Sequence, residues 1–201
     1  MNVMSVAESI RNRVLRIRKG EPFTTGSFLH AGSRPAVDKA LSRLVEEGLI
    51  DRVARGVFVR PKISKFVGKV MPSVAQVINA MAKSSGETLQ IHGAEAVRRF
   101  QISTQMPVKA VYYTNGASRE VTVCNTKVRL IHTSSTKKLQ HAGTNVGAAI
   151  SALWYLGKDD VGEREILLIA KGLSRVEFER LCGSKLPNWM VEALKQYSPS
   201  D

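Results

Sequence analysis

Residues 32–61 read GSRPAVDKALSRLVEEGLIDRVARGVFVRP, and this stretch decides the fold of the N-terminal part of the chain. Its apolar residues first recur at helical spacing, from Val37 through Ala40, Leu41 and Leu44 to Val45. That spacing predicts a helix with one buried face. The residues that flank the stripe agree with a helix, because Ser33 is a good cap residue, Pro35 suits the first turn and Gly48 ends the run.

The second half of the same stretch changes to a strand pattern. Residues 49–53 and 57–61 are two short β-prone runs, and the turn between them contains Gly56. Two such runs around a glycine-containing turn predict a β-hairpin. The hairpin would follow the helix directly.

Two further helices are predicted upstream of this stretch. An apolar stripe at helical spacing predicts a helix over residues 5–17. The hydroxyls at Thr24–Thr25 can cap a short second helix, with Phe28 and Leu29 as its core residues. Three helices followed by a small hairpin predict a winged helix-turn-helix domain over residues 1–67.

The charge of the chain points to a nucleic-acid partner. Lysine and arginine total 30 and aspartate and glutamate total 17, a formal net charge of +13. Residues 1–69 hold 14 basic and 6 acidic residues, a net of +8, whereas residues 70–201 hold 16 and 11, a net of +5. Basic proteins bind nucleic acid, anionic membranes or acidic partners. Because the excess is concentrated in the predicted winged helix, we expect it to bind double-stranded DNA.

The free face of the predicted third helix and the predicted wing supply the candidate contacts. A helix with small and basic side chains can enter the major groove and present donors to base edges. Arg34 and Lys39 are the best candidates for a guanine, and Asp38 can hold Arg34 in place or accept from a cytosine. The candidate DNA-binding residues are Ser33, Arg34, Pro35, Asp38, Lys39, Ser42 and Arg43 on the helix, and Arg52, Arg55 and Arg60 on the wing.

Residues 68–201 are predicted to form an α+β domain, in which helices cover a small antiparallel sheet. Residues 61–72 connect it to the first domain, and their β-branched and aromatic side chains indicate a connection that packs against the protein. Asn115–Gly116 separates two β-rich runs, at residues 108–113 and 119–124, and predicts a hairpin. A third strand is predicted at residues 127–132, and amphipathic helices follow. One of them is predicted over residues 163–171, and Ser174 with Glu177 predicts a capping box for the next.

The residues argue against catalysis. The chain has no glycine-rich phosphate loop and no nucleophile motif, and its four histidines are scattered. Its two cysteines, Cys124 and Cys182, lack metal-type spacing, and we interpret them as buried, reduced thiols, with a disulfide as the alternative. We therefore expect no metal and no cofactor. The absence of a secretory pattern at the N-terminus and of a long apolar run predicts a cytoplasmic protein without a membrane partner.

The first 65 residues resemble a known family. The Gly-Ser-Arg before the third helix, the Ala-Leu-Ser-Arg-Leu of residues 40–44, the Glu-Gly-Leu-Ile exit and the Arg-Gly wing resemble the N-terminal domain of the AbiE-type (abortive-infection) antitoxins, and more closely their DUF6088 branch. The resemblance implies a bacterial antitoxin that represses its own operon through the winged helix. It also implies that the second domain neutralises a nucleotidyltransferase-like toxin and takes part in phage defence.

Two other functions fit the same residues. The protein could be an ordinary winged-helix transcriptional regulator whose C-terminal domain binds a small molecule or forms a dimer. It could also be a nucleic-acid-processing enzyme with an appended winged helix. A nucleotidyltransferase-like gene directly downstream favours the antitoxin, a co-purifying small ligand favours the regulator, and metal-dependent turnover of nucleotides favours the enzyme.

Overall fold

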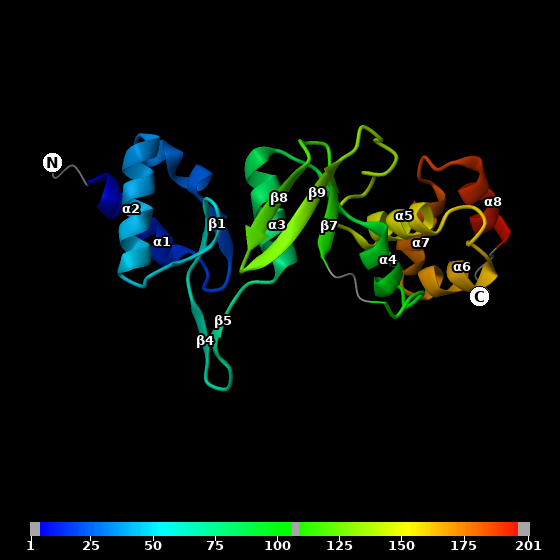
Figure 1. Cartoon of the computed structure of the whole chain (residues 1–201), viewed down its shortest axis with the longest axis horizontal. Helices are drawn as coiled ribbons and strands as arrows, with labels where there is room; N and C mark the ends of the chain where they lie inside the picture. The colour runs from blue at the N-terminus through cyan, green and yellow to red at the C-terminus, as the bar shows by residue number, and fades with distance from the viewer. Residues whose placement is uncertain (1–4, 106–108, 197–201) are drawn as a thin grey trace. The chain divides into compact units, whose positions relative to one another are not determined.

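The computed structural model of the chain describes residues 5–105 and 109–196. Helices and short strands occur together throughout, so the predicted α+β class is confirmed (Figure 1). The chain forms two compact units, residues 1–86 with 121–126, and residues 87–120 with 127–201. The sequence-predicted boundary at 67/68 lies inside the first of these units.

Three helical segments open the first unit: α1 (Val6–Arg16), the 3-10 helix η1 (Thr25–Ala31) and α2 (Arg34–Glu46). Ser5 caps α1 by accepting a hydrogen bond from the backbone N–H of Glu8. The predicted apolar stripes meet in one core, which contains Ile10, Val14, Phe23, Phe28, Val37, Ala40, Leu41, Leu44, Ile50 and Phe58. Phe28 is buried as predicted, but the prediction for Leu29 is wrong, because this side chain is 44% exposed.

A three-stranded antiparallel sheet closes this core. Its strands are β1 (Pro22–Thr24), β2 (Asp51–Ala54) and β3 (Val57–Val59), in the order β1-β3-β2. The predicted hairpin is β2–β3. The register of the pair shifts between Arg52 and Ala54, so Val53 is an extra residue in β2. The carbonyl of Val53 accepts a hydrogen bond from the backbone N–H of Cys124 at 2.9 Å, which ties residues 121–126 to the first unit.

Helix α3 (Val74–Ser85) also belongs to the first unit. It begins with a capping box, in which the Ser73 hydroxyl accepts from the Gln76 backbone and the Gln76 side chain accepts from the Ser73 backbone. The helix packs against β1, and the hydroxyls of Thr24 and Ser84 lie 2.9 Å apart. Residues after 67 therefore pack within the first unit, and Val77, Ile78 and Ala82 of α3 are buried.

The segment between β3 and α3 forms a second hairpin, from β4 (Lys62–Ser64) and β5 (Gly68–Val70). In Figure 1 this hairpin projects from the remainder of its unit. The prediction that its apolar residues pack against the protein is wrong, because Ile63, Phe66 and Val67 are 76%, 96% and 73% exposed. Among the strands of the described residues, these two pair only with each other, so the hairpin is not extended into a larger sheet.

The four-stranded sheet contains β6 (Leu89–Ile91), β7 (Ala110–Thr114), β8 (Arg119–Val123) and β9 (Thr126–His132), in the order β6-β7-β9-β8. β6 pairs antiparallel with β7, and β9 pairs parallel with β7. The sheet is therefore mixed rather than purely antiparallel. The predicted start of β7 at Val108 lies outside the described residues.

The predicted hairpin at Asn115–Gly116 is wrong, because β9 lies between β7 and β8. Side-chain hydrogen bonds hold this turn in another conformation: Asn115 Oδ1 accepts from the Thr88 backbone at 2.8 Å, and Thr114 Oγ1 accepts from the Gly116 backbone at 2.9 Å. The two-residue turn lies instead at Cys124–Asn125, between β8 and β9. Both residues have positive φ, 46° and 67°, as the primed hairpin turns require.

The described part of the second unit also contains five helices: α4 (Gly93–Arg99), α5 (Asn145–Leu156), α6 (Glu163–Lys171), α7 (Arg175–Cys182) and α8 (Asn188–Gln196). α5 is buried along most of its length and packs against α4 and α7. An alanine Cβ at Gly93 would lie 2.0 Å from Cβ of Tyr155 and 2.7 Å from the carbonyl oxygen of Ser151. The close approach of α4 and α5 therefore depends on a residue without a side chain.

Cys124 and Cys182 lie closer to the surface than the sequence predicts. Both thiols are free, but the prediction that they are buried is wrong, because Cys124 is half-buried and Cys182 is exposed. Burial still raises the pKa of each thiol above its ordinary value. No helix within the described residues is long and apolar enough to cross a membrane.

His92 lies at the start of α4, and its pKa is lower than the ordinary histidine value. Its Nδ1 accepts a hydrogen bond from the Ala94 backbone at 3.3 Å and so caps α4, and its ring lies against Tyr113 and Tyr155. Partial burial, with a smaller contribution from the positive charge of Lys138, lowers the pKa of His92. The folded protein therefore favours the neutral ring.

This shift predicts a loss of stability in mild acid. A histidine whose pKa is lower in the folded than in the unfolded chain stabilises the fold fully above its unfolded pKa. That contribution is lost as the pH falls from about 6.5 towards the folded pKa. Urea unfolding of His92→Asn, which keeps a capping oxygen, should show a smaller drop in unfolding free energy between about pH 7.5 and 5.5 than wild type. An identical drop in both proteins would contradict the prediction.

Candidate nucleic-acid interface

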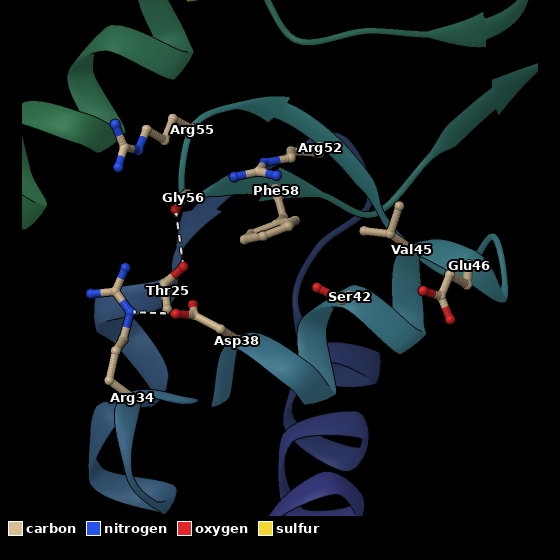
Figure 2. A pocket seen from close by; sticks show the side chains of 10 residues that line it. All are labelled: Thr25, Arg34, Asp38, Ser42, Val45, Glu46, Arg52, Arg55, Gly56 and Phe58. Atoms are coloured by element: carbon tan, nitrogen blue, oxygen red, sulfur yellow. Dashed lines mark hydrogen bonds and ion pairs between the residues drawn. The ribbon is translucent and has the colours of Figure 1, made fainter. Parts of the chain in front are cut away.

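A hollow of about 680 Å³ lies between α2 and the β2–β3 hairpin in the first unit (Figure 2). One wall comes from the helix and the other from the hairpin, and the start of η1 contributes to one side. The hollow is lined by Thr25, Arg34, Asp38, Ser42, Val45, Glu46, Arg52, Arg55, Gly56 and Phe58.

The helical wall follows from the amphipathic pattern of α2. Its buried face carries Val37, Ala40, Leu41 and Leu44, all at most 5% exposed. Arg34, Asp38 and Ser42 are spaced by four residues, so they form a row on one exposed face. Arg34 Nε donates to Asp38 Oδ2 at 2.9 Å, with the two side chains 60% and 49% exposed. This pair adds little to stability, but it orients the guanidinium along the helix surface.

The hairpin wall carries Arg52 and Arg55. The turn at Gly56, which has a φ of +71°, lets β2 and β3 reverse direction in a short space. The carbonyl oxygen of Gly56 accepts a hydrogen bond from the buried Thr25 backbone at 3.0 Å, so the turn is fixed to the start of η1. In Figure 2, Arg55 and Arg34 lie at the same end of the hollow, and Glu46 lies at the other end.

Five of the ten sequence-predicted residues line this hollow, and they come from both predicted elements: Arg34, Asp38, Ser42, Arg52 and Arg55. Four others, Ser33, Pro35, Lys39 and Arg43, are exposed on or beside α2 but do not line it. They lie on the adjoining surface of the same helix. The structure thus brings the helix row and the two hairpin arginines together.

Arg60 has a different position. Its guanidinium Nη1 donates to the carbonyl oxygen of Leu15 at 2.6 Å and to that of Ile17 at 2.8 Å. These carbonyls lie at the C-terminal end of α1, where backbone acceptors lack a partner within the helix. Arg60 thus joins β3 to α1 and does not line the hollow with the other two wing residues.

This placement predicts that Arg60 contributes to stability. Arg60→Ala should lower the free energy of unfolding by about 2 kcal/mol, because two charge-assisted hydrogen bonds are lost and the helix-end carbonyls stay without this partner. Arg52→Ala, which removes an exposed arginine from the neighbouring strand, is the matched control and should change stability by less than about 0.5 kcal/mol. Urea unfolding curves of the two variants check this. Equal unfolding midpoints would remove the structural role from Arg60.

Sequence reasoning missed Thr25, Val45, Glu46, Gly56 and Phe58 as lining residues. The glycine was recognised as a turn residue, and Thr25 was considered only as a helix cap. Phe58 is 7% exposed and stacks on Phe23 at a ring-centroid distance of 6.1 Å, so it belongs to the core as well as to the hollow. No local sequence signal separates these two roles.

The charges of the hollow suit a polyanion. Arg34, Arg52 and Arg55 supply guanidinium donors, whereas Asp38 is paired with Arg34 and Glu46 lies at the far end. Guanidinium groups can donate to phosphate oxygens and to the O6 and N7 atoms of guanine. Within the described residues, no three histidine, cysteine, aspartate or glutamate side chains gather as a metal site would require.

The chain matches a known protein family. A family described as a family of unknown function (DUF6088) matches residues 9–181, which include most of both units. No curated protein matches the chain. Because the match covers well over half of the sequence, the chain belongs to the DUF6088 family.

Proposed function

We propose that the first unit is a winged helix-turn-helix domain that binds duplex DNA. The observation that carries this proposal is the hollow, where a polar row on α2 faces two arginines of the β2–β3 hairpin. In this interpretation α2 is the recognition helix and Arg55 lies at the wing. Such a helix reads base edges in the major groove, while the wing holds phosphates or the adjacent minor groove.

The proposed biological role is that of an antitoxin and autorepressor in the cytoplasm. The resemblance of residues 23–60 to AbiE-type antitoxins supports this role, and the net charge of +8 in residues 1–69 supports binding to the promoter. The second unit would neutralise a nucleotidyltransferase-like toxin encoded next to this gene. Co-expression tests neutralisation directly: growth should be arrested by the toxin alone and restored when this protein is present.

Two arginine variants test the DNA-binding mode. Arg34→Ala should cost about 1–3 kcal/mol of binding free energy on the DNA upstream of the gene, and it should relax preference at one base pair. Arg55→Ala should weaken binding to specific and to random duplexes by similar factors, because a wing arginine contacts the DNA backbone. Mobility-shift titrations with both duplexes measure the difference. Equal losses on both duplexes for Arg34→Ala would remove Arg34 from the base-reading residues.

A further inference from the structure

The β4–β5 hairpin carries apolar side chains that the protein does not cover. Phe66 is 96% exposed, and Ile63 and Val67 are 76% and 73% exposed. Isolated two-stranded hairpins are marginally stable in water, and a cluster of exposed apolar side chains marks an interaction site. The cluster therefore indicates a partner for the hairpin.

The hairpin is held at its base. Lys69 Nζ lies 2.6 Å from Asp51 Oδ1, and Asp51 is the first residue of β2, the strand that leads to the proposed wing. At the tip, the backbone N–H of Phe66 donates to Ser64 Oγ at 3.2 Å. Each strand has three paired residues, and the loop between them has three residues. At the usual rise per residue, the hairpin is roughly 15 Å long from its base to its tip. The hairpin tip, with Phe66, therefore lies well away from the paired base of the hairpin.

The charge of the hairpin and of the chain on either side of it favours a polyanionic partner. Residues 52–86 contain no aspartate or glutamate, but they contain seven basic residues: Arg52, Arg55, Arg60, Lys62, Lys65, Lys69 and Lys83. Lys62 and Lys65 are exposed on the hairpin, whereas Lys69 is paired with Asp51. An apolar tip between lysines matches the minor-groove binders, which hold phosphates with basic side chains and insert an apolar wedge between base steps.

We propose that the β4–β5 hairpin is a second DNA-contacting element, in which Phe66 inserts at a base step of the minor groove and Lys62 and Lys65 hold the flanking phosphates. This inference rests on the proposed DNA-binding function of the same unit. The inserted ring partly unstacks the step and bends the duplex. The hairpin extends the bound site beyond the base pairs that α2 can reach.

The test uses the full-length protein, the duplex directly upstream of its gene and a random duplex of equal length. Fluorescence anisotropy at several salt concentrations measures affinity, and energy transfer between dyes at the duplex ends measures bending. Phe66→Ala should weaken binding about tenfold and abolish the bend, without changing the slope of log affinity against log salt. Lys65→Gln should make that slope shallower by about 0.9 and retain the bend. Neither exposed side chain supports the core, and circular dichroism verifies the fold.

Val176→Ala and Lys158→Gln, exposed positions of the second unit, are the matched controls and should behave as wild type. If wild type binds and bends DNA and Phe66→Ala does so equally well, the hairpin proposal is overturned while the proposed function stands. If wild type binds neither duplex at low salt, both are overturned. Vesicles of phosphatidylserine and phosphatidylcholine form a third arm: Phe66-dependent binding to vesicles, with unchanged DNA binding, would assign the hairpin to a membrane and overturn the proposal.

Discussion

Replacing Arg34 and Arg55 together with glutamate is expected to weaken binding to the DNA upstream of the gene by at least about a hundredfold near 0.1 M salt. Both side chains lie at the same end of the hollow, one from α2 and one from the hairpin (Figure 2). Each lost arginine contact costs about 1–3 kcal/mol, and each new carboxylate repels the phosphates. Mobility-shift titration of the full-length variant measures the loss.

The matched control makes the same change of charge in the second unit, by replacing two of its exposed arginines with glutamate. Arg164 and Arg175 are 73% and 84% exposed, and each forms an ion pair at the surface. Replacing both with glutamate also removes four units of positive charge. If this control variant loses as much affinity as the Arg34/Arg55 variant, net charge explains the binding and the hollow does not.

The Arg34/Arg55 double variant also separates the two proposed activities. A promoter reporter should be derepressed, while growth should still be rescued from the co-expressed toxin, because the second unit is unchanged. Immunoblotting checks that the protein level is the same. Loss of rescue by a soluble variant would mean that the DNA-binding unit itself takes part in neutralisation.

Gly93→Ala is expected to lower the unfolding free energy of the protein by about 3 kcal/mol or more. The added Cβ would lie 2.0 Å from Tyr155 Cβ and 2.7 Å from the Ser151 carbonyl oxygen, both of which belong to α5. Neither atom is the end of a flexible side chain, so the helices α4 and α5 must separate. Contacts along their buried faces are lost as a result.

Urea unfolding measures this effect, with Gly183→Ala as the control. Gly183 follows α7 with a φ of −80°, and a Cβ there would come no closer than 3.5 Å to another residue. The control variant should be nearly neutral. A Gly93→Ala protein with the wild-type midpoint would show that α4 and α5 can adjust at little cost.

Local patterns predicted the helices well. The stripe from Val37 to Val45 gave the buried face of α2, and Glu163–Lys171 is a helix with the predicted bounds. Ser174 and Glu177 form the predicted capping box at the start of α7. These features depend on residues within one or two turns, which a single sequence displays directly.

Strand pairing was harder to predict because it depends on residues far apart. β1 has three residues and pairs with β3, whose residues lie more than thirty positions later. Asn115–Gly116 predicts that the two strands on either side of it pair, but β7 pairs with β9 in place of β8. The exposure of the β4–β5 hairpin was also not predicted, because apolar side chains were expected to be buried against the protein.

In the candidate site, too, features set by nearby residues were predicted and features set by distant residues were not. The four-residue spacing of Arg34, Asp38 and Ser42 was enough to place them on one face of α2. The predicted hairpin was enough to place Arg52 and Arg55 beside this helix. The position of Arg60 could not be predicted in the same way, because its partners are carbonyl oxygens at the end of α1, some forty residues earlier. A long, flexible side chain can reach several surfaces, and only the folded chain shows which one it uses.

The hydrogen bond from Cys124 to Val53 has a consequence for synthesis on the ribosome. The first unit includes residues 121–126, yet residues 87–120 are made before them. At about 5–20 residues per second, the 40 residues from 87 to 126 take roughly 2–8 s to add. During that interval the edge of β2 at Val53 lacks its native partner and is open to strands of neighbouring nascent chains. A pause in translation between these two points would prolong that exposure.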